Sequence, residues 1–284
     1  MMPFPDTARA EAAALAGDLP GLLMEARRLA AAAPGAHGRR RAGQGEAFWQ
    51  YRDHRAEEGA RAVDWRRSAR GDRLYVRERE LDAAQSALFW IDPAPGFDWA
   101  SDGAYPRKFR RALVVSVALA TLFSRGGERI GALGGPPRLG ARAVERFALD
   151  LIAARAEEPP QAPARARVLL ASDFYAPVET WRGHLARLAG VGASGALLMI
   201  ADPAEEDFPY DGRTLFHEVG GRRELLLGRA GSARAEFSAR LAAHRRAMRE
   251  VARGLGFVLL THRTDHPAAP VFSALADALS GRAR

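Results

Sequence analysis

The sequence predicts an α/β protein with a doubly wound, mostly parallel sheet and an N-terminal helical and extended appendage. From residue 87 onward, short apolar runs alternate with longer segments of helical periodicity. The apolar runs are continuous, which is typical of strands buried on both faces of a parallel sheet. At 284 residues, with 48% hydrophobic and 27% charged residues, the chain has the length and composition of a globular protein.

The first 84 residues are predicted to form the appendage. Two alanine-rich helices are expected over residues 7–16 and 19–33, and a Pro-Gly step ends the second. The stretch that follows is rich in glycine and charge, so it makes a poor core and should lie along another domain. Alternation from Leu74 onward predicts a strand. We therefore divide the chain into a region over 1–84 and an α/β domain over 85–284.

The α/β domain is predicted as strands and helices in turn. Each strand is an apolar run that ends in a polar or turn residue, and each helix carries an apolar face. Strands are expected over residues 87–91, 129–133, 167–173, 195–203, 222–228 and 256–265. Helices are expected over residues 107–125, 141–156, 178–189, 232–255 and 270–279.

Polar residues follow several of these strands. In an open parallel sheet the strand ends meet at one edge, where ligands bind. Carboxylates gathered there could hold Mg²⁺, and the alternative is that Asp and Ser cap the following helices. The candidate metal ligands are Asp92 and Asp173. The candidates for a partner-binding rim are Asp98, Ser101, Ser172, Asp202 and Asp265.

Other patterns favour structural roles. The glycine-rich loop over 131–140 lacks a Gly-Lys-Ser/Thr step, so it is not a Walker motif. His262 and His266 lie four residues apart after a strand and are expected to cap or to lie on the surface. Trp65, with Asp64, Arg67 and Arg70 nearby, is expected to be a packing anchor with a rim of ion pairs. A partner-binding surface is the second interpretation of Trp65.

The charge raises the question of nucleic acid or an acidic membrane surface, because the net charge is +8 and the pI about 10.7. However, one lysine stands among 42 basic residues, which indicates a coding bias toward arginine. The run Arg39, Arg40 and Arg41 could bind phosphates, but Glu46 and Asp53 lie close enough in sequence to pair with it. We expect no nucleic-acid partner.

The chain contains no cysteine, which excludes disulfides, thiolate zinc sites and cysteine nucleophiles. Its first residues lack the apolar segment of a signal peptide. The longest apolar run covers residues 112–123, too few for a membrane span of about 20 residues. We expect a cytoplasmic protein.

Residues 38–92 resemble the signature of the bacterial MoxR-associated family known as domain of unknown function fifty-eight. The match rests on Gly43-x-Gly45-Glu46-x-Phe48, Arg61-Ala62-Val63-Asp64-Trp65, Ser68-Ala69-Arg70 and Leu74-Tyr75-Val76-Arg77. The resemblance implies a von Willebrand factor A-like domain and a partnership with a MoxR-type AAA+ ATPase. It implies no assigned catalytic activity.

The von Willebrand A-like fold often carries a metal-ion-dependent adhesion site, with an Asp-x-Ser-x-Ser pattern after the first strand and an Asp after a later one. Asp92 and Asp173 match the two aspartates, whereas Ala94 and Gly96 replace the two serines. A cation held by two carboxylates and water binds weakly. We therefore expect Asp92 and Asp173 to be the remnant of such a site, with no cofactor, and Mg²⁺ as the alternative.

The functional hypothesis is a non-enzymatic adaptor that works with a MoxR-type AAA+ ATPase in client remodelling or complex maturation. Other proteins of the same gene neighbourhood are expected as partners, and they could bring the protein to a membrane surface. One alternative is a metal-assisted or phosphate-handling enzyme that uses Asp92 and Asp173. Another is a basic nucleic-acid-binding protein.

Overall fold

The computed structural model describes most of the chain, in two compact units that are treated separately. The described residues are 13–32, 48–53, 63, 65–69, 71, 73–79, 86–140, 142–219 and 223–280. The first unit takes in Met1–Arg39 and Ser86–Arg284, and the second Arg40–Gln85.

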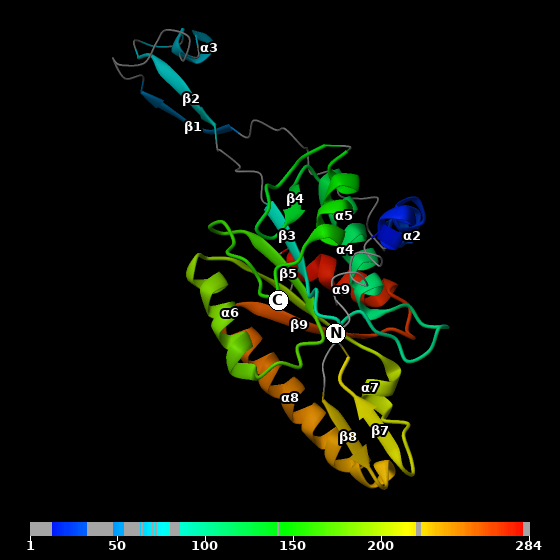
Figure 1. Cartoon of the computed structure of the whole chain (residues 1–284). Helices are drawn as coiled ribbons and strands as arrows, with labels where there is room; N and C mark the ends of the chain where they lie inside the picture. The colour runs from blue at the N-terminus through cyan, green and yellow to red at the C-terminus, as the bar shows by residue number, and fades with distance from the viewer. Residues whose placement is uncertain are drawn as a thin grey trace. The chain divides into compact units, whose positions relative to one another are not determined.

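The first unit is built on a five-stranded parallel sheet (Figure 1). The strands lie in the order β4-β3-β5-β6-β9. Strand β3, the first of them along the chain, therefore lies between β4 and β5. Their bounds are β3 Ser86–Ile91, β4 Arg129–Ala132, β5 Arg167–Ser172, β6 Ser194–Ala201 and β9 Phe257–Arg263. The predicted α/β class and parallel sheet are confirmed.

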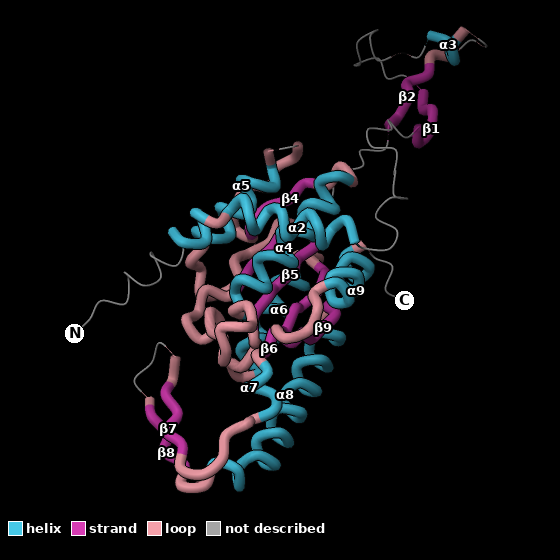
Figure 2. The backbone as a smooth tube through the Cα atoms, turned by 90° about the vertical axis from the view of Figure 1, so that its right-hand side faces the viewer, coloured by secondary structure: helices cyan, strands magenta, loops and turns pink. Residues whose placement is uncertain are grey.

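Helices cover both faces of this sheet (Figures 1 and 2). One face packs against α2, α4, α5 and α9, and the other against α6 and α8. Their bounds are α2 Leu19–Ala32, α4 Lys108–Arg125, α5 Ala143–Ala153, α6 Val178–Gly190, α8 Arg234–Gly254 and α9 Ala269–Leu279. All six lie within or close to the predicted helices.

The continuous apolar strands supply two cores by alternation. In β3, Phe89 and Ile91 face the helices of the first layer, whereas Leu88 and Trp90 face α6 and α8. All four side chains are buried. This is the arrangement that an apolar run without polar interruptions predicts.

The N-terminal helix belongs to the α/β unit instead of an appendage. Helix α2 buries Leu22, Ala26 and Ala30, one side chain per turn, in the core that it shares with α4. Arg110 of α4 also forms ion pairs with Asp18 and Glu25, at 2.9 and 3.2 Å. The structural grouping therefore differs from the expected region over 1–84.

A hairpin between β6 and α8 was missed in the sequence. It pairs β7 (Thr214–His217) with β8 (Glu224–Leu227), and only β8 was predicted. Phe216 of β7 stacks on Phe208, with ring centroids 5.7 Å apart, and Phe208 packs on Phe237 of α8. Two short elements flank the hairpin, helix α7 (Pro203–Asp207) before it and the 3₁₀ helix η2 (Ala230–Ala233) after it.

The second unit contains an antiparallel pair, β1 (Phe48–Asp53) and β2 (Tyr75–Arg79), and the short helix α3 (Trp65–Ser68). The strand predicted from Leu74 corresponds to β2. Across the described residues of both units, no helix combines the length and the apolarity needed to cross a membrane.

Candidate functional site

The carboxyl edge of the sheet brings together the strand-end residues. Asp92 follows β3, Ser172 and Asp173 close β5, and Asp202 follows β6. Because the strands are parallel and adjacent, these residues meet at one edge, as predicted. The backbone ties them further, since the Asp92 amide donates to the Ala171 carbonyl at 2.9 Å.

Asp92 is held by hydrogen bonds that both of its carboxylate oxygens accept. Oδ2 accepts from the Ser172 hydroxyl at 2.6 Å, and Oδ1 accepts from the Ala94 amide at 2.9 Å. The Ser172 oxygen in turn accepts from the Phe174 amide at 3.0 Å. Burial raises the pKa of Asp92, opposed by the hydrogen bond from Ser172. Asp92 therefore fastens the β3 loop to the end of β5.

Lys108 is the central cation of this edge and was missed as a site residue. It begins α4, and its side chain is 0% exposed. Its ammonium donates to Asp173 Oδ2 at 3.1 Å and to Glu205 Oε1 at 2.6 Å. A buried charge is tolerated only when oppositely charged and hydrogen-bonding groups surround it. Lys108 thus joins the start of α4, the end of β5 and helix α7.

Asp202 and Glu205 form a capping box on α7. Asp202 Oδ1 accepts from the Ala204 amide and Glu205 Oε2 accepts from the Asp202 amide, both at 2.9 Å. The second Asp202 oxygen accepts from the Ser101 amide at 2.9 Å, which fixes the loop before α4. Burial raises the pKa of Glu205, opposed by the neighbouring Lys108 charge.

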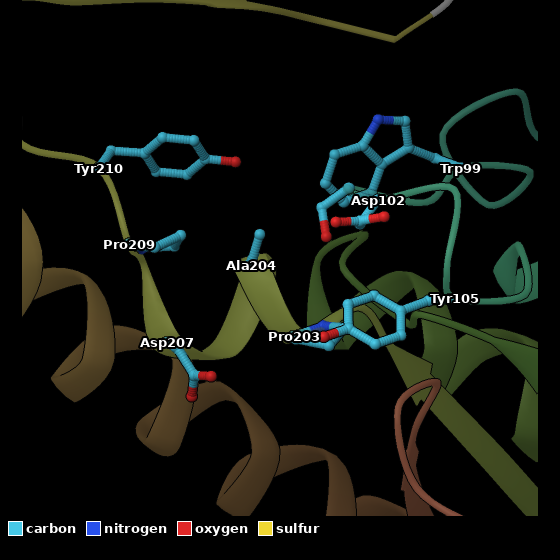
Figure 3. A pocket seen from close by; sticks show the side chains of 9 residues that line it. Trp99, Asp102, Tyr105, Pro203, Ala204, Asp207, Pro209 and Tyr210 are labelled. Atoms are coloured by element: carbon cyan, nitrogen blue, oxygen red, sulfur yellow. The ribbon is translucent and has the colours of Figure 1, made fainter.

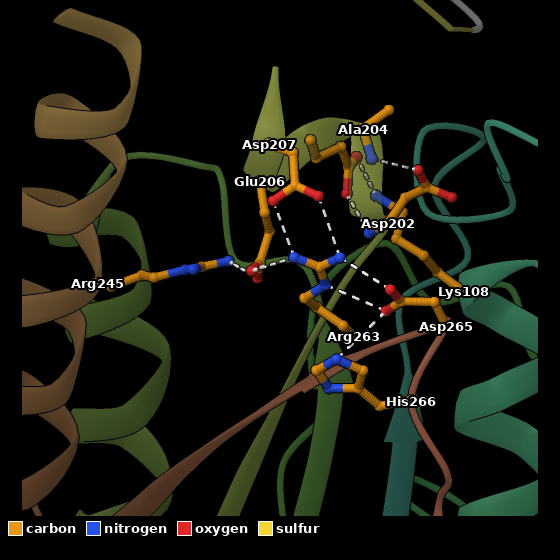
Figure 4. A network of polar contacts seen from close by, with 10 residues as sticks. Lys108, Asp202, Ala204, Glu206, Asp207, Arg245, Arg263, Asp265 and His266 are labelled. Carbon is orange, nitrogen blue, oxygen red and sulfur yellow. Dashed lines mark hydrogen bonds and ion pairs between the residues drawn. The ribbon is translucent and has the colours of Figure 1, made fainter. Parts of the chain in front are cut away.

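A second ionic network lies beside the first (Figure 4). Arg263 of β9 forms two hydrogen bonds with Asp207, at 2.9 and 3.1 Å, and two with Asp265, at 3.1 and 2.8 Å. Arg245 of α8 donates to Glu206 at 2.5 Å. The hydrogen bonds from Arg263 lower the pKa of Asp265. Several acidic side chains of this edge are therefore neutralised by partners within the chain.

An aromatic groove opens next to these networks, with a volume of about 410 Å³ (Figure 3). Trp99 and Tyr210 face one another across it, and Tyr105 lines the same groove. Burial raises the pKa of Tyr210, helped by the charges of Asp202 and Glu205. The remaining residues of the groove are Ser101, Asp102, Ala204, Asp207 and Pro209. The sequence signal is three aromatic residues in two loops, Trp99 and Tyr105 between β3 and α4 and Tyr210 between α7 and β7.

Two of the candidate rim residues cannot reach a partner. Ser172 and Asp202 are 0% exposed, and each forms hydrogen bonds within the chain. They therefore stabilise the loops and do not form a binding rim. Asp98 and Asp265 are ion-paired with Arg107 and Arg263, at 3.2 and 2.8 Å. Ser101 is exposed, and its backbone amide donates a hydrogen bond to Asp202.

His262 does not cap an element or lie on the surface, as was expected. It lies within β9, not in the loop after it, and its side chain is 7% exposed. Its Nε2 atom makes no hydrogen bond to any described residue. Burial lowers the pKa of His262 to about 4, helped by the neighbouring charge of Arg111. His266 is exposed, as expected, and lies 3.8 Å from Asp265.

The described part of the chain contains no group of three or more His, Asp or Glu side chains arranged to hold a metal ion. Asp92 and Asp173, the two candidate ligands, are engaged by Ser172 and Lys108 instead.

The signature residues are only partly described. Ser68 is buried, and its hydroxyl accepts from the Tyr75 amide at 2.9 Å. Trp65 is 60% exposed, and its expected role as an anchor of this region on the sheet stays a prediction. The side chain of Arg67 is not among those that the structure describes. Also outside the described residues are Gly43, Gly45, Glu46, Asp64, Arg70 and the basic run Arg39, Arg40 and Arg41.

Comparison with known proteins identifies the family. Residues 50–247 match the family described as "Protein of unknown function DUF58". Uncharacterized protein Mb1516 of Mycobacterium bovis and Uncharacterized protein Rv1480 of Mycobacterium tuberculosis are each 27% identical over 250 residues, which cover 78% of this chain and 76% of theirs. No solved structure matches the chain. Because the family match spans more than half of the sequence, the chain belongs to the DUF58 family.

Proposed function

We propose that this protein is a non-enzymatic adaptor that binds a protein partner through the carboxyl edge of its sheet. The partner we propose is a MoxR-type AAA+ ATPase acting in client remodelling or complex maturation, with proteins of the same gene neighbourhood as further partners. The observation that carries the proposal is the aromatic groove of Trp99, Tyr105 and Tyr210.

The groove has the chemistry of a protein-binding surface. Trp and Tyr are enriched among the residues that contribute most binding energy, because they bury large area at a low cost in conformational entropy. The loops that carry them are held by the Ser101–Asp202 hydrogen bond and by the capping box of α7. Asp102 adds negative charge to the groove, which favours a partner segment that carries a basic side chain, whereas the charge of Asp207 is offset by Arg263.

A von Willebrand A-like character for the α/β unit is part of the proposal. The parallel sheet places Asp92 after its first strand and Asp173 after its third, in keeping with the aspartates of the adhesion-site pattern. An isolated antiparallel bridge between Ile130 and Arg138 extends the β4 edge. The position of the two aspartates supports the proposed fold, in which the carboxyl edge of the sheet is the binding face.

The enzyme alternative has a specific difficulty. It requires Asp92 and Asp173 to bind a metal ion, either alone or together with the phosphate group of a substrate. Asp92 accepts hydrogen bonds from Ser172 and Ala94, and Asp173 accepts them from Lys108 and from the Tyr175 amide at 3.1 Å. A metal would have to displace these donors. We therefore propose no cofactor and no catalytic residue.

The test is direct binding between the purified full-length protein and a MoxR-type ATPase of the same organism, measured by biolayer interferometry with MgATP. Trp99→Ala should weaken binding about tenfold or more, as expected when an aromatic hot-spot residue is removed. The matched control is Leu139→Ala, because Leu139 is 55% exposed and lies outside the groove. Circular dichroism verifies that both variants are folded.

The outcomes separate the hypotheses. Binding that Trp99→Ala weakens and that both Leu139→Ala and Asp92→Ala preserve supports the adaptor hypothesis and a structural role for Asp92. No binding to the ATPase, or equal binding by Trp99→Ala and wild type, contradicts it. Retention on a polyanion that falls steeply with salt would favour the nucleic-acid alternative instead.

A further inference from the structure

Lys108 is chemically distinct from every other basic residue of the protein. It is the single lysine among 42 lysine and arginine residues, and its side chain is fully buried. An ammonium is a compact point charge with three donors, whereas a guanidinium is a planar fork that spreads its charge. A sequence that otherwise uses arginine therefore has a lysine at a position that encloses a small cation.

The surroundings of the Lys108 ammonium are those of a bound cation. Carboxylate oxygens of Asp173 and Glu205 contact it at 3.1 and 2.6 Å. The rings of Phe97 and Tyr175 flank it, with centroids at 5.7 and 5.6 Å. The two oxygen ligands thus come from the loop after β5 and from helix α7, and the loop after β3 contributes the ring of Phe97. Oxygen ligands drawn from several loops are how a protein encloses a hard metal ion.

The backbone holds the start of α4 in place around this charge. The Lys108 amide donates to the Trp99 carbonyl and the Phe109 amide to the Phe97 carbonyl, both at 3.1 Å. The lysine stem is therefore anchored to the same loop that carries the groove residue Trp99. The position of the ammonium and the shape of the groove are set by one piece of chain.

A divalent cation does not fit beside this ammonium. It would need Asp173 Oδ2, which already accepts from Lys108, and Asp92 Oδ2, which already accepts from Ser172. It would also lie close to a buried positive charge, where little water screens the repulsion. The residues present do not suit the metal that a von Willebrand A-like fold implies.

The geometry points to Lys108 as a built-in substitute for that metal ion: its ammonium occupies the cation position at the carboxyl edge and holds the three loops together without a metal. This inference rests on the proposed von Willebrand A-like character but not on any partner. Its consequence is that the groove keeps its shape at any Mg²⁺ concentration.

The first test observes the wild-type ammonium itself. Because Lys108 is the single lysine, protein labelled with ¹⁵N and ¹³C only in lysine gives one side-chain ammonium signal in a heteronuclear NMR spectrum. We expect this signal to be unchanged when about 10 mM MgCl₂ is added, a concentration that saturates ordinary protein Mg²⁺ sites. A saturable shift on addition of Mg²⁺ would show that the metal displaces the lysine and would overturn the inference.

The second test removes the cation and asks whether a metal takes its place. In Lys108→Ser the carboxylates of Asp173 and Glu205 lose their partner, so Mn²⁺ should bind roughly tenfold or more tightly than to wild type, as measured by electron paramagnetic resonance. Adding Asp173→Asn should abolish the gain. Arg245→Ser is the matched control, because it breaks a neighbouring ion pair outside the cation position and should bring no gain.

A folded Lys108→Ser that gains no affinity for Mn²⁺ contradicts the inference, as does a wild-type protein that binds Mn²⁺ as tightly as the variant. If Lys108→Ser does not fold, the NMR titration of the wild-type ammonium decides. Neither measurement uses a partner protein, so failure of the adaptor hypothesis would leave the result unaffected.

Discussion

Acidification should destabilise the protein through His262. The side chain is buried in β9, and its Nε2 atom makes no hydrogen bond within the described chain. Burial and the nearby charges of Arg111 and His266 lower its pKa from 6.5 to about 4, although Asp265 opposes them. The perturbation is a change of pH from 7 to 4.5, compared between wild type and His262→Phe, which keeps a ring and cannot titrate.

The sign of the effect follows from proton binding. Between pH 4 and 6.5 the unfolded chain binds the His262 proton and the folded chain does not, so stability falls as the pH falls through this interval. A pKa difference of about 2.5 at 1.36 kcal/mol per pH unit sets an upper limit of about 3 kcal/mol. At pH 4.5 most of this is lost, about 2 kcal/mol.

The assay is urea unfolding followed by tryptophan fluorescence at the two pH values. Protonation of carboxylates contributes in both proteins, so the quantity of interest is the difference between wild type and His262→Phe in the free energy lost on acidification. We expect about 2 kcal/mol less loss in the variant. His217→Gln is the control, because His217 is 62% exposed and is not one of the charged groups that act on His262, and it should lose as much as wild type. Equal losses in wild type and His262→Phe would refute the reasoning.

Single substitutions at Gly195, Asp92 and Trp65 should each change stability in a defined way. Gly195→Ala should cost about 3 kcal/mol or more in urea unfolding, because an added Cβ would lie 1.9 Å from the Val168 carbonyl oxygen on β5; a stable variant would contradict this packing. Asp92→Asn should gain stability relative to wild type as the pH rises above about 4, the ordinary pKa of an aspartate: burial raises the pKa of Asp92 in the folded state, so folded wild type gives up a proton that folding favours, and a constant difference between the two unfolding free energies would count against it. Trp65→Ala should change the unfolding free energy by less than about 0.5 kcal/mol, because Trp65 is 60% exposed; a large loss would support the predicted anchor instead.

The groove and Lys108 lie close together but have different proposed roles. Trp99 and Tyr210 of the groove would bind the partner protein, whereas Lys108 would hold the loops around them in shape. The ring of Tyr175 flanks the ammonium, and desolvation of its hydroxyl and the nearby charges of Glu205 and Asp173 raise its pKa. A neutral phenol therefore lies beside Lys108, on a residue that is 39% exposed.

The sequence alone determined the α/β architecture, because it depends on periodicity along short stretches. The run Ala112–Phe123 within α4 and the apolar run of β3 carry their periodicity in consecutive residues, so their structure could be predicted without knowing their neighbours. The positions of Asp92 and Asp173 at one edge followed from the same local signal, since strand ends of a parallel sheet lie together.

Only the tertiary structure decided what these residues contact. Lys108 and Glu205 lie 97 residues apart, and no local pattern indicates that the single lysine enters a cage of carboxylates. Burial of His262 and exposure of Trp65 likewise depend on which segments pack against them. Strand β7 has four residues, and its Phe216 packs on Phe208, which in turn packs on Phe237, so its formation needed contacts that a short window cannot contain. Local periodicity thus determines elements, whereas charge pairing and burial are properties of segments that meet only in the folded chain.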